Sequence, residues 1–317
     1  MSADPSNGAR TIAGFWRRVG AFLVDCVLLG TIGTVAGFFL TDEFVRLGAW
    51  GRLLGFSVAI AYFGTLNSRL TGGQTLGKRL LKIKVVAKDG TPLSVPTSFL
   101  RFLPLGAPWF LNHAQLPESA LFSFSGYVLS IMIFGLGLSV VYLFVFNRPS
   151  RQSLDDLLVG SYVVAADATG PVVSAAPRRL HLVVCVLLLV AAGVIPYFTK
   201  DLAAGEPFAS LILVQRTVAS VPWVVSAQVN KGKGFRAATG KGKSTTTYMG
   251  IIADCRDPDI KNAARAKELA KLALSADSSA GSLDVIRVTL VYGYDIGIAS
   301  SWKSQINAHS PVEWLAE

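Results

Sequence analysis

Residues 72–79, "GGQTLGKR", place glycines and a lysine in a spacing close to that of the phosphate-binding P-loop, G-x-x-x-x-G-K-[ST]. In a P-loop this stretch follows a buried strand, and its last hydroxyl holds Mg²⁺. Here the last position is Arg79, which cannot bind a cation, and the preceding segment 53–67 is a long apolar run. The pattern therefore does not predict a nucleotide site. The residues that need another explanation are Gly73, Gly77, Lys78 and Arg79.

Asp25 is the sharpest candidate for chemistry, because it lies inside the apolar run 19–40. At about 1.5 Å per residue it lies roughly 9 Å along a helix that begins at the start of that run. A carboxylate inside a membrane is costly and is by default a hypothesis for a functional site. Two interpretations remain open: an ion or proton site, or a buried ion pair that fixes helix packing. Arg18 lies two turns earlier on the same face, and Arg101 or another helix is a candidate partner.

Two further charged residues have alternative readings. Arg101 lies in the apolar segment 99–116, where it either lines a cavity or extends its side chain to lipid phosphate. Asp156 lies in a polar loop, where we expect it to cap a helix or to pair with Arg79 or Arg151 rather than to line a pathway.

The composition predicts a membrane protein with a soluble part. The chain has 317 residues, of which 51% are hydrophobic and only 16% charged, and its mean hydropathy is +0.48. Soluble domains carry about 25% charged residues. The formal net charge of +10 fits basic loops that orient helices beside anionic lipid better than it fits nucleic-acid binding.

The cysteines and histidines give no sign of a metal centre or a bound cofactor. Cys26 and Cys185 lie in apolar runs, and Cys255 stands alone in a polar region. There is no C-x-x-C, and the histidines are scattered. We therefore expect neither a disulfide framework nor a metal site.

The apolar segments predict an α-helical integral membrane protein with about five transmembrane helices, since about 20 apolar residues span a bilayer. The segment 99–116 is short and interrupted by Pro104 and Pro108, so a full crossing and a re-entrant segment both remain open. The predicted spans are 19–40, 50–67, 99–116, 120–146 and, as an additional helix, 180–198.

Basic residues concentrate in two loops, 68–98 and 147–179, and in the N-terminal segment 1–18. By the positive-inside rule all three are cytoplasmic. Residues 199–317 then lie outside the cytoplasm.

Residues 199–317 predict a C-terminal α+β domain. Strand-like stretches at 245–254 and 283–298 flank a helical stretch at 258–276, which together form a β-α-β unit. The Gly/Lys-rich segment 230–244 is expected to be a loop or hairpin tip. The stretch 208–225 contains a central arginine, so we predict an amphipathic helix followed by a strand rather than another span. A turn with a helix cap is expected at 254–257.

The loop after the second span also has strand character. "KIKVVAKDG" alternates in polarity and ends in a turn signal, which suggests a hairpin-like loop. Residues 158–165 are a second candidate strand, and we expect the two to pair beneath the membrane.

Three stretches together resemble the RDD family of prokaryotic membrane proteins. "FWRRVGAFLVD" at 15–25 has the R-x-x-A-x-x-x-D spacing, "GGQTLGKRLLKIKVV" has the G-x-T-x-G-K-R pattern, and "RQSLDDLLVGSYVV" resembles the closing element. The family's arginine and two aspartates correspond to Arg18, Asp25 and Asp156. Ser153 and Ser161 replace threonines, and Asp155 stands where a histidine is frequent.

The resemblance covers about 10–165 and implies an RDD-like membrane domain at 19–166 in a prokaryotic inner membrane. It also implies a transporter, a monovalent cation/proton exchanger with Asp25 as the exchange site and Arg18 and Arg101 tuning it. The alternative is a non-transporting membrane anchor whose outer domain binds an envelope protein or a second copy of the chain. No residue pattern predicts an enzyme, and the expected partners are the lipid bilayer, cations and protons, without nucleic acid.

Overall fold

The computed structural model describes residues 12–114, 122–238 and 241–316. The chain divides into two compact units, which we call the helical unit and the sheet unit. The helical unit comprises Met1–Phe39, Ala49–Tyr197 and Asp295–Ala299. The sheet unit comprises Leu40–Gly48, Phe198–Tyr294 and Ser300–Glu317.

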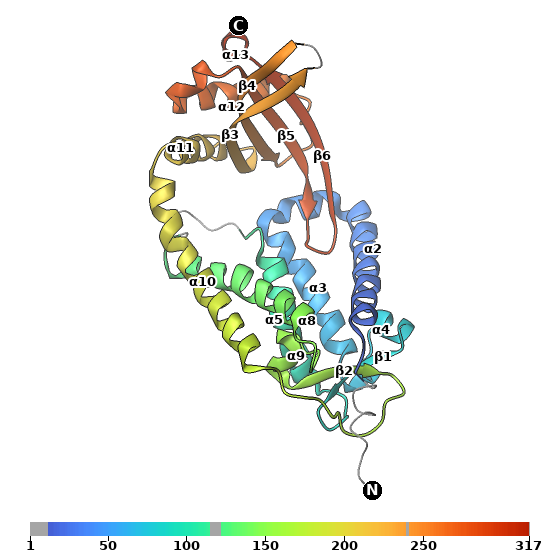
Figure 1. Ribbon diagram of the computed structural model, residues 1–317. Helices are drawn as coiled ribbons and strands as arrows, with labels where there is room; N and C mark the ends of the chain where they lie inside the picture. Colours follow the sequence, from blue (N-terminus) through green and yellow to red (C-terminus); the bar gives the residue numbers. More distant parts are fainter. Residues whose placement is uncertain (1–11, 115–121, 239–240, 317) are drawn as a thin grey trace. The chain divides into compact units, whose positions relative to one another are not determined.

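Long apolar helices form the helical region (Figure 1). Helices α2 (Phe15–Leu47) and α3 (Gly51–Leu66) are joined by a 3₁₀ turn at Gly48–Trp50. A positive φ of 50° at Gly48 suits a residue without a Cβ atom. Within α2 the backbone leaves helical geometry at Leu40, where the predicted first span ends.

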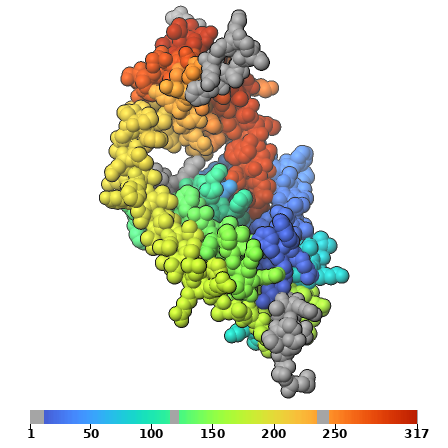
Figure 2. Space-filling view, viewed as in Figure 1, coloured from blue at the N-terminus to red at the C-terminus, as the bar shows by residue number. Residues whose placement is uncertain are grey.

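Three helical stretches among the described residues are long and apolar enough to cross a membrane. They are Phe15–Leu66, which contains the predicted spans 19–40 and 50–67, Phe124–Phe146 and Arg179–Ala204. The last is helix α10, whose apolar side chains are largely exposed (Figure 2, yellow-green). Exposed apolar side chains along a helix of this length are typical of a lipid-facing surface.

Helix α5 (Val95–Leu111) begins before the predicted segment 99–116 and contains both Pro104 and Pro108. The expectation that these prolines interrupt the helix was wrong. Each removes one backbone donor, yet the helix runs through both, and before them it packs against α3 through aromatic rings. The rings of Phe102 and Phe63 stack with centroids 5.1 Å apart. Residues 115–121 lie outside the described residues.

The predicted span 120–146 consists of α7 (Phe124–Ser130), a π-helical turn (Ile131–Leu136) and α8 (Gly137–Phe146). The Ser130 hydroxyl donates a hydrogen bond to the Ala192 carbonyl of α10 at 2.6 Å. This bond ties α7 to α10.

The two loop strands pair as predicted. Strand β1 (Ile83–Ala87) lies antiparallel to β2 (Ser161–Ala165), with Val85 opposite Val163. The predicted start of the second strand was wrong, because residues up to Val159 belong to α9 (Leu154–Val159), which ends at Gly160 with a φ of 67°. Helix α4 (Leu76–Leu80) precedes β1.

The sheet unit contains a four-stranded sheet in the order β3-β4-β5-β6. The predicted β-α-β unit is present, since β4 and β5 are parallel and α12 connects them. Helices α11 and α13 also belong to this part of the chain. The bounds are α11 (Phe208–Ala219), β3 (Val224–Ala238), β4 (Lys241–Cys255), α12 (Ala263–Ala276), β5 (Val285–Asp295), β6 (Ser300–His309) and α13 (Pro311–Leu315).

Of the two alternatives for 230–244, the hairpin tip is confirmed and the loop is wrong. The described residues of this segment continue strands β3 and β4, because each strand supplies the other's backbone hydrogen bonds whatever the side chains are. The helix cap expected at 254–257 was wrong. Helix α12 is capped by Asn262, whose side chain accepts from the Ala264 N–H, and not by residues 254–257.

Candidate functional site

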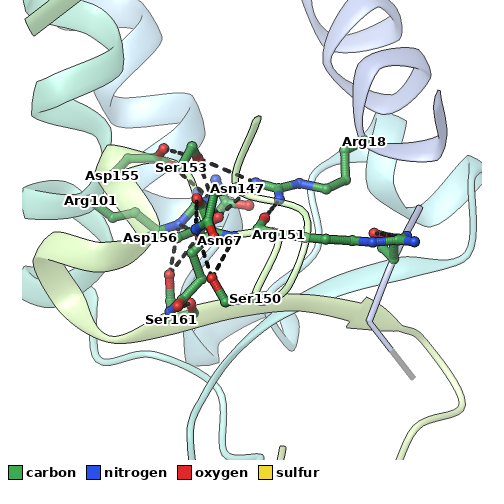
Figure 3. A network of polar contacts seen from close by, with 12 residues as sticks. Arg18, Asn67, Arg101, Asn147, Ser150, Arg151, Ser153, Asp155, Asp156 and Ser161 are labelled. Carbon is green, nitrogen blue, oxygen red and sulfur yellow. Dashed lines mark hydrogen bonds and ion pairs between the residues drawn. The ribbon is translucent and has the colours of Figure 1, made fainter. Parts of the chain in front are cut away.

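A buried network of charged side chains joins four elements of the helical unit. The elements are the first turns of α2, the short helices α4 and α9, and the first half of α5. Figure 3 shows part of this network. Its charged members are Arg18, Asp25, Lys78, Arg101, Asp155 and Asp156.

Asp156 lies at the centre of the network and is 0% exposed. Its Oδ2 accepts from Arg18 Nη2 at 2.6 Å, and its Oδ1 accepts from Arg101 Nη2 at 2.7 Å. The Ser161 hydroxyl donates to Oδ1 at 2.9 Å. Burial by itself raises the pKa of Asp156, but the two arginines and these hydrogen bonds lower it to about 2. The carboxylate therefore stays ionised at neutral pH.

Arg101 is also buried, at 8% exposed, and pairs with two carboxylates. Its Nη2 lies 2.8 Å from Asp155 Oδ2 as well as close to Asp156. An extended side chain that reaches lipid phosphate is therefore the wrong alternative. Figure 3 shows Arg101 directed toward Asp156.

The predicted partners of Asp156 were also wrong. Arg79 is exposed. Arg151 contributes its backbone carbonyl, which accepts from Arg18, while its guanidinium donates to the Ala13 carbonyl. Arg18 becomes the partner because the start of α2 lies beside the segment before α9, where Arg18 also donates to the Arg151 carbonyl and the Ser153 hydroxyl.

Asp25 is 1% exposed and is held by uncharged groups. The Tyr62 hydroxyl and the Gly77 N–H donate to Oδ1 at 2.7 and 2.8 Å, and the Thr75 hydroxyl donates to Oδ2 at 2.6 Å. Arg101, the candidate partner of Asp25, binds Asp156 instead, so the ion pair considered for Asp25 does not form with it. The bonds join α2 to α3 and to α4.

The glycines of "GGQTLGKR" make this arrangement possible. A Cβ atom at Gly77 would lie 2.0 Å from the Ala21 carbonyl oxygen, so only glycine lets α4 approach α2 this closely. Gly73 has a φ of 77°, and a Cβ there would lie 2.2 Å from the Val85 carbonyl oxygen. Gly77 and Gly73 therefore allow close packing, Gly77 against α2 and Gly73 against β1. In a P-loop, glycines at similar spacing serve instead to bind phosphate.

Lys78 is the member of the network whose charge changes near neutral pH. Its Nζ donates to Asn67 Oδ1 at 2.7 Å. Burial lowers the pKa of Lys78 to about 7, with a further contribution from the positive charge of Arg101, although Asp25 and Asp156 partly oppose this change. The sequence singled out Lys78 only as part of a motif.

A cavity of about 320 Å³ lies beside the network. Its polar lining includes Arg18, Lys78, Arg101 and Asp155, and its apolar lining includes Phe22, Phe63, Phe102 and Phe144. The described residues include no group of three or more His, Cys, Asp or Glu side chains that could hold a metal ion.

Sequence reasoning missed Tyr62, Thr75, Asn67 and the role of Asp155. Of these residues, only Thr75 and Asp155 could have been found from the sequence, because both lie within stretches that resemble family motifs. Tyr62 and Asn67 lie at the end of α3 without any pattern that marks them.

Comparisons with known proteins find similarity in the first half of the chain. The family model for the RDD family matches residues 12–160. The uncharacterized protein YckC of Bacillus subtilis (strain 168) is 26% identical over 154 residues, which cover 49% of this chain and 85% of YckC. No solved structure gives a significant match. The part of the chain that holds the charged network, residues 12–160, is therefore the part that is similar to the RDD family.

Proposed function

We propose that the helical unit is a membrane exchanger of monovalent cations for protons, in which Lys78 carries the proton. The observation that supports this most strongly is the charge composition of the network. Three basic side chains face three acidic ones, and only one of the bases, Lys78, has a pKa near neutrality.

The physical argument follows from burial. An arginine does not lose its proton in a protein, and Asp156 stays ionised because its pKa is about 2. When Lys78 is protonated the six charges balance. When it releases its proton the network carries one uncompensated negative charge, which is costly in a buried place. A monovalent cation that enters the cavity beside the network, where Asp155 is the carboxylate in the lining, restores the balance.

Asp25, the exchange site of the sequence-based hypothesis, has three of its acceptor positions occupied by protein donors. We therefore assign it a positioning role. Its bonds to Thr75 and Gly77 hold the first turn of α4, and this turn carries Lys78. Loss of Asp25 would displace Lys78 from its neighbours.

The same proposal places the chain in a prokaryotic plasma membrane, as a multi-pass protein without enzymatic activity. The basic loops support a cytoplasmic N-terminus and an extracytoplasmic sheet unit. The expected partners are lipid, protons and monovalent cations, and no nucleic acid.

The test is flux in liposomes that contain the purified full-length chain and a pH-sensitive dye. We expect Na⁺, Li⁺ or K⁺ added outside to change the internal pH. Lys78→Arg keeps the positive charge but cannot release a proton, so it should abolish the response. Arg79→Gln removes the exposed neighbouring charge and should leave the response intact. A cation response that survives in Lys78→Arg would refute the assignment of Lys78.

A second candidate is a non-transporting anchor whose sheet unit binds an envelope protein. Strand β6 favours it, because the strand lies at the sheet edge and exposes Trp302 and Ile306 by 50% and 56%. An exposed edge strand is a template for pairing with another chain. This candidate predicts no cation-driven pH change, and a cellular phenotype that is lost when residues 199–317 are deleted.

A further inference from the structure

A second cavity of about 560 Å³ lies in the helical unit where two candidate membrane spans end. One side of it is formed by the start of α2, including Phe15, and the other by the end of α8, including Phe144. The rings of Phe15 and Phe144 lie 5.0 Å apart between centroids. The candidate spans begin at Phe15 and end at Phe146, so in a membrane this cavity lies at the depth of the lipid headgroups.

The charge of the cavity is entirely positive among the described residues that line it. Four of these residues are arginines and none is acidic. Arg18 is neutralised by Asp156, and Arg17 donates to the carbonyls of Leu81 and Lys82. The two remaining arginines are Arg148 and Arg151.

Arg148 and Arg151 are exposed, and their guanidinium N–H groups remain available as hydrogen-bond donors. Within the described residues no hydrogen bond or ion pair of the Arg148 side chain is found, and Arg151 makes one long bond to the Ala13 carbonyl at 3.4 Å. A guanidinium group binds a phosphate through two parallel hydrogen bonds. The cavity therefore offers two phosphate-binding side chains without a competing carboxylate.

We propose that this cavity binds the phosphodiester headgroup of an anionic phospholipid. Basic pockets between membrane helices recognise anionic headgroups. Trp16, which is 80% exposed beside the cavity, is a residue type that concentrates at the membrane interface.

A lipid fits the cavity better than a soluble phosphate does, because the lining also contains apolar groups. Phe15, Phe144 and Val145 line it together with the arginines. Acyl chains of a bound lipid can continue along the exposed apolar surface of the adjoining spans, where Val141 and Val145 are exposed. A free phosphate ion gains nothing from such groups.

The experiment measures lipid binding to the purified full-length chain by native mass spectrometry. Phosphatidylglycerol and phosphatidylcholine with identical acyl chains are added in equal amounts. The site variant is Arg148→Gln with Arg151→Gln. The matched control is Arg178→Gln with Arg179→Gln, which removes two exposed arginines at the start of another candidate span, α10, outside the cavity.

We expect the unchanged chain to prefer phosphatidylglycerol. The site variant should lose this preference by roughly 10- to 30-fold, since each arginine near anionic lipid contributes about a factor of five. The control should keep it. Arg148→Lys with Arg151→Lys should retain part of the preference, because the charges remain while the paired hydrogen bonds of guanidinium are lost. This intermediate result separates loss of charge from misfolding.

Three results would overturn the proposal. One is an absence of preference for phosphatidylglycerol in the unchanged chain. Another is an equal loss in the site variant and in the control, which would indicate general attraction by surface charge. The third is full competition by free glycerol phosphate at the lipid's own concentration, which would identify a soluble phosphate as the ligand.

Discussion

Asp156→Asn tests the charged network directly, because Asp156 is the residue that both buried arginines share. Asparagine has nearly the same shape but no charge. The substitution leaves Arg18 and Arg101 in a buried place, where Asp155 remains as a carboxylate partner for Arg101 only. We expect a large loss of stability without a change in side-chain volume.

The size of this loss follows from two estimates. A pKa of about 2, compared with the usual 3.8, means that the folded protein favours the ionised carboxylate by about 2 kcal/mol. Removing one partner from a buried ion pair costs about 3–5 kcal/mol. A loss of about 3 kcal/mol corresponds to a fall in Tm of roughly 6–12 °C for a unit of this size.

The dependence on pH has a definite sign. The pKa of Asp156 is lower in the folded state than in the unfolded state, so its contribution is present above 3.8 and is lost as the pH falls toward 2. The difference in Tm between the unchanged chain and Asp156→Asn should therefore be largest near neutral pH. It should shrink once the pH falls below 3.8.

The assay uses a thiol-reactive dye that becomes fluorescent when a buried cysteine is exposed by heating in detergent. Cys185 is buried in α10 and serves as the reporter. The exposed Cys26, and Cys255 in the sheet unit, are first replaced by serine so that only the helical unit is reported.

Asp155→Asn is the matched control, because Asp155 pairs with Arg101 alone and leaves both arginines bound to Asp156. We expect it to lower the Tm by less than half as much. If Asp156→Asn melted within 2 °C of the unchanged chain, a shift below about 1 kcal/mol, the network would not stabilise the fold and the reasoning would be refuted.

Further predictions concern the neighbouring features. Gly77→Ala should lower the Tm of the helical unit, because the added Cβ atom would collide with the Ala21 carbonyl oxygen. An unchanged Tm in the same dye assay would contradict the close approach of α4 to α2. Between pH 7 and 10.5 the folded Lys78 has lost its proton but the unfolded one has not, so the stability of the unchanged chain should rise with pH. Lys78→Met should abolish this rise. Tm measured against pH checks this, and the same profile in both proteins would contradict it. Asn262→Ala should destabilise the sheet unit by about 1 kcal/mol, because it removes the N-cap of α12. The dye assay tests this in a chain that keeps Cys255 as its one cysteine. An unchanged Tm would mean that water replaces the lost hydrogen bond.

Regular patterns in the sequence predicted the elements with strong periodicity. The apolar runs, the pairing of the two loop strands and the parallel β-α-β unit follow from residues whose local preference agrees with the fold. The edge strand β6 was not predicted, and for 230–244 the sequence left a loop and a hairpin tip open, because their Gly, Ser and Lys residues have no strand preference.

The site was only partly predictable, for a related reason. The family motifs named Arg18, Asp25 and Asp156, but a linear pattern does not say which charges meet. Arg101 meets Asp156 only because the first half of α5, before its prolines, passes α9. The titrating role of Lys78 depends on its burial next to Arg101, which no local sequence pattern encodes.

Loss of flux in an Asp25 variant would not distinguish a transport site from a structural clamp. Its carboxylate accepts three hydrogen bonds from α3, α4 and the residue before α4, so a substitution there disturbs packing whatever the protein transports. Lys78→Arg is different in kind, because it preserves the charge that Asp25 and Asp156 experience and only removes the ability to release a proton near pH 7. A folded Lys78→Arg protein without flux, beside an unchanged Arg79→Gln protein, would separate proton exchange from the structural role of the network.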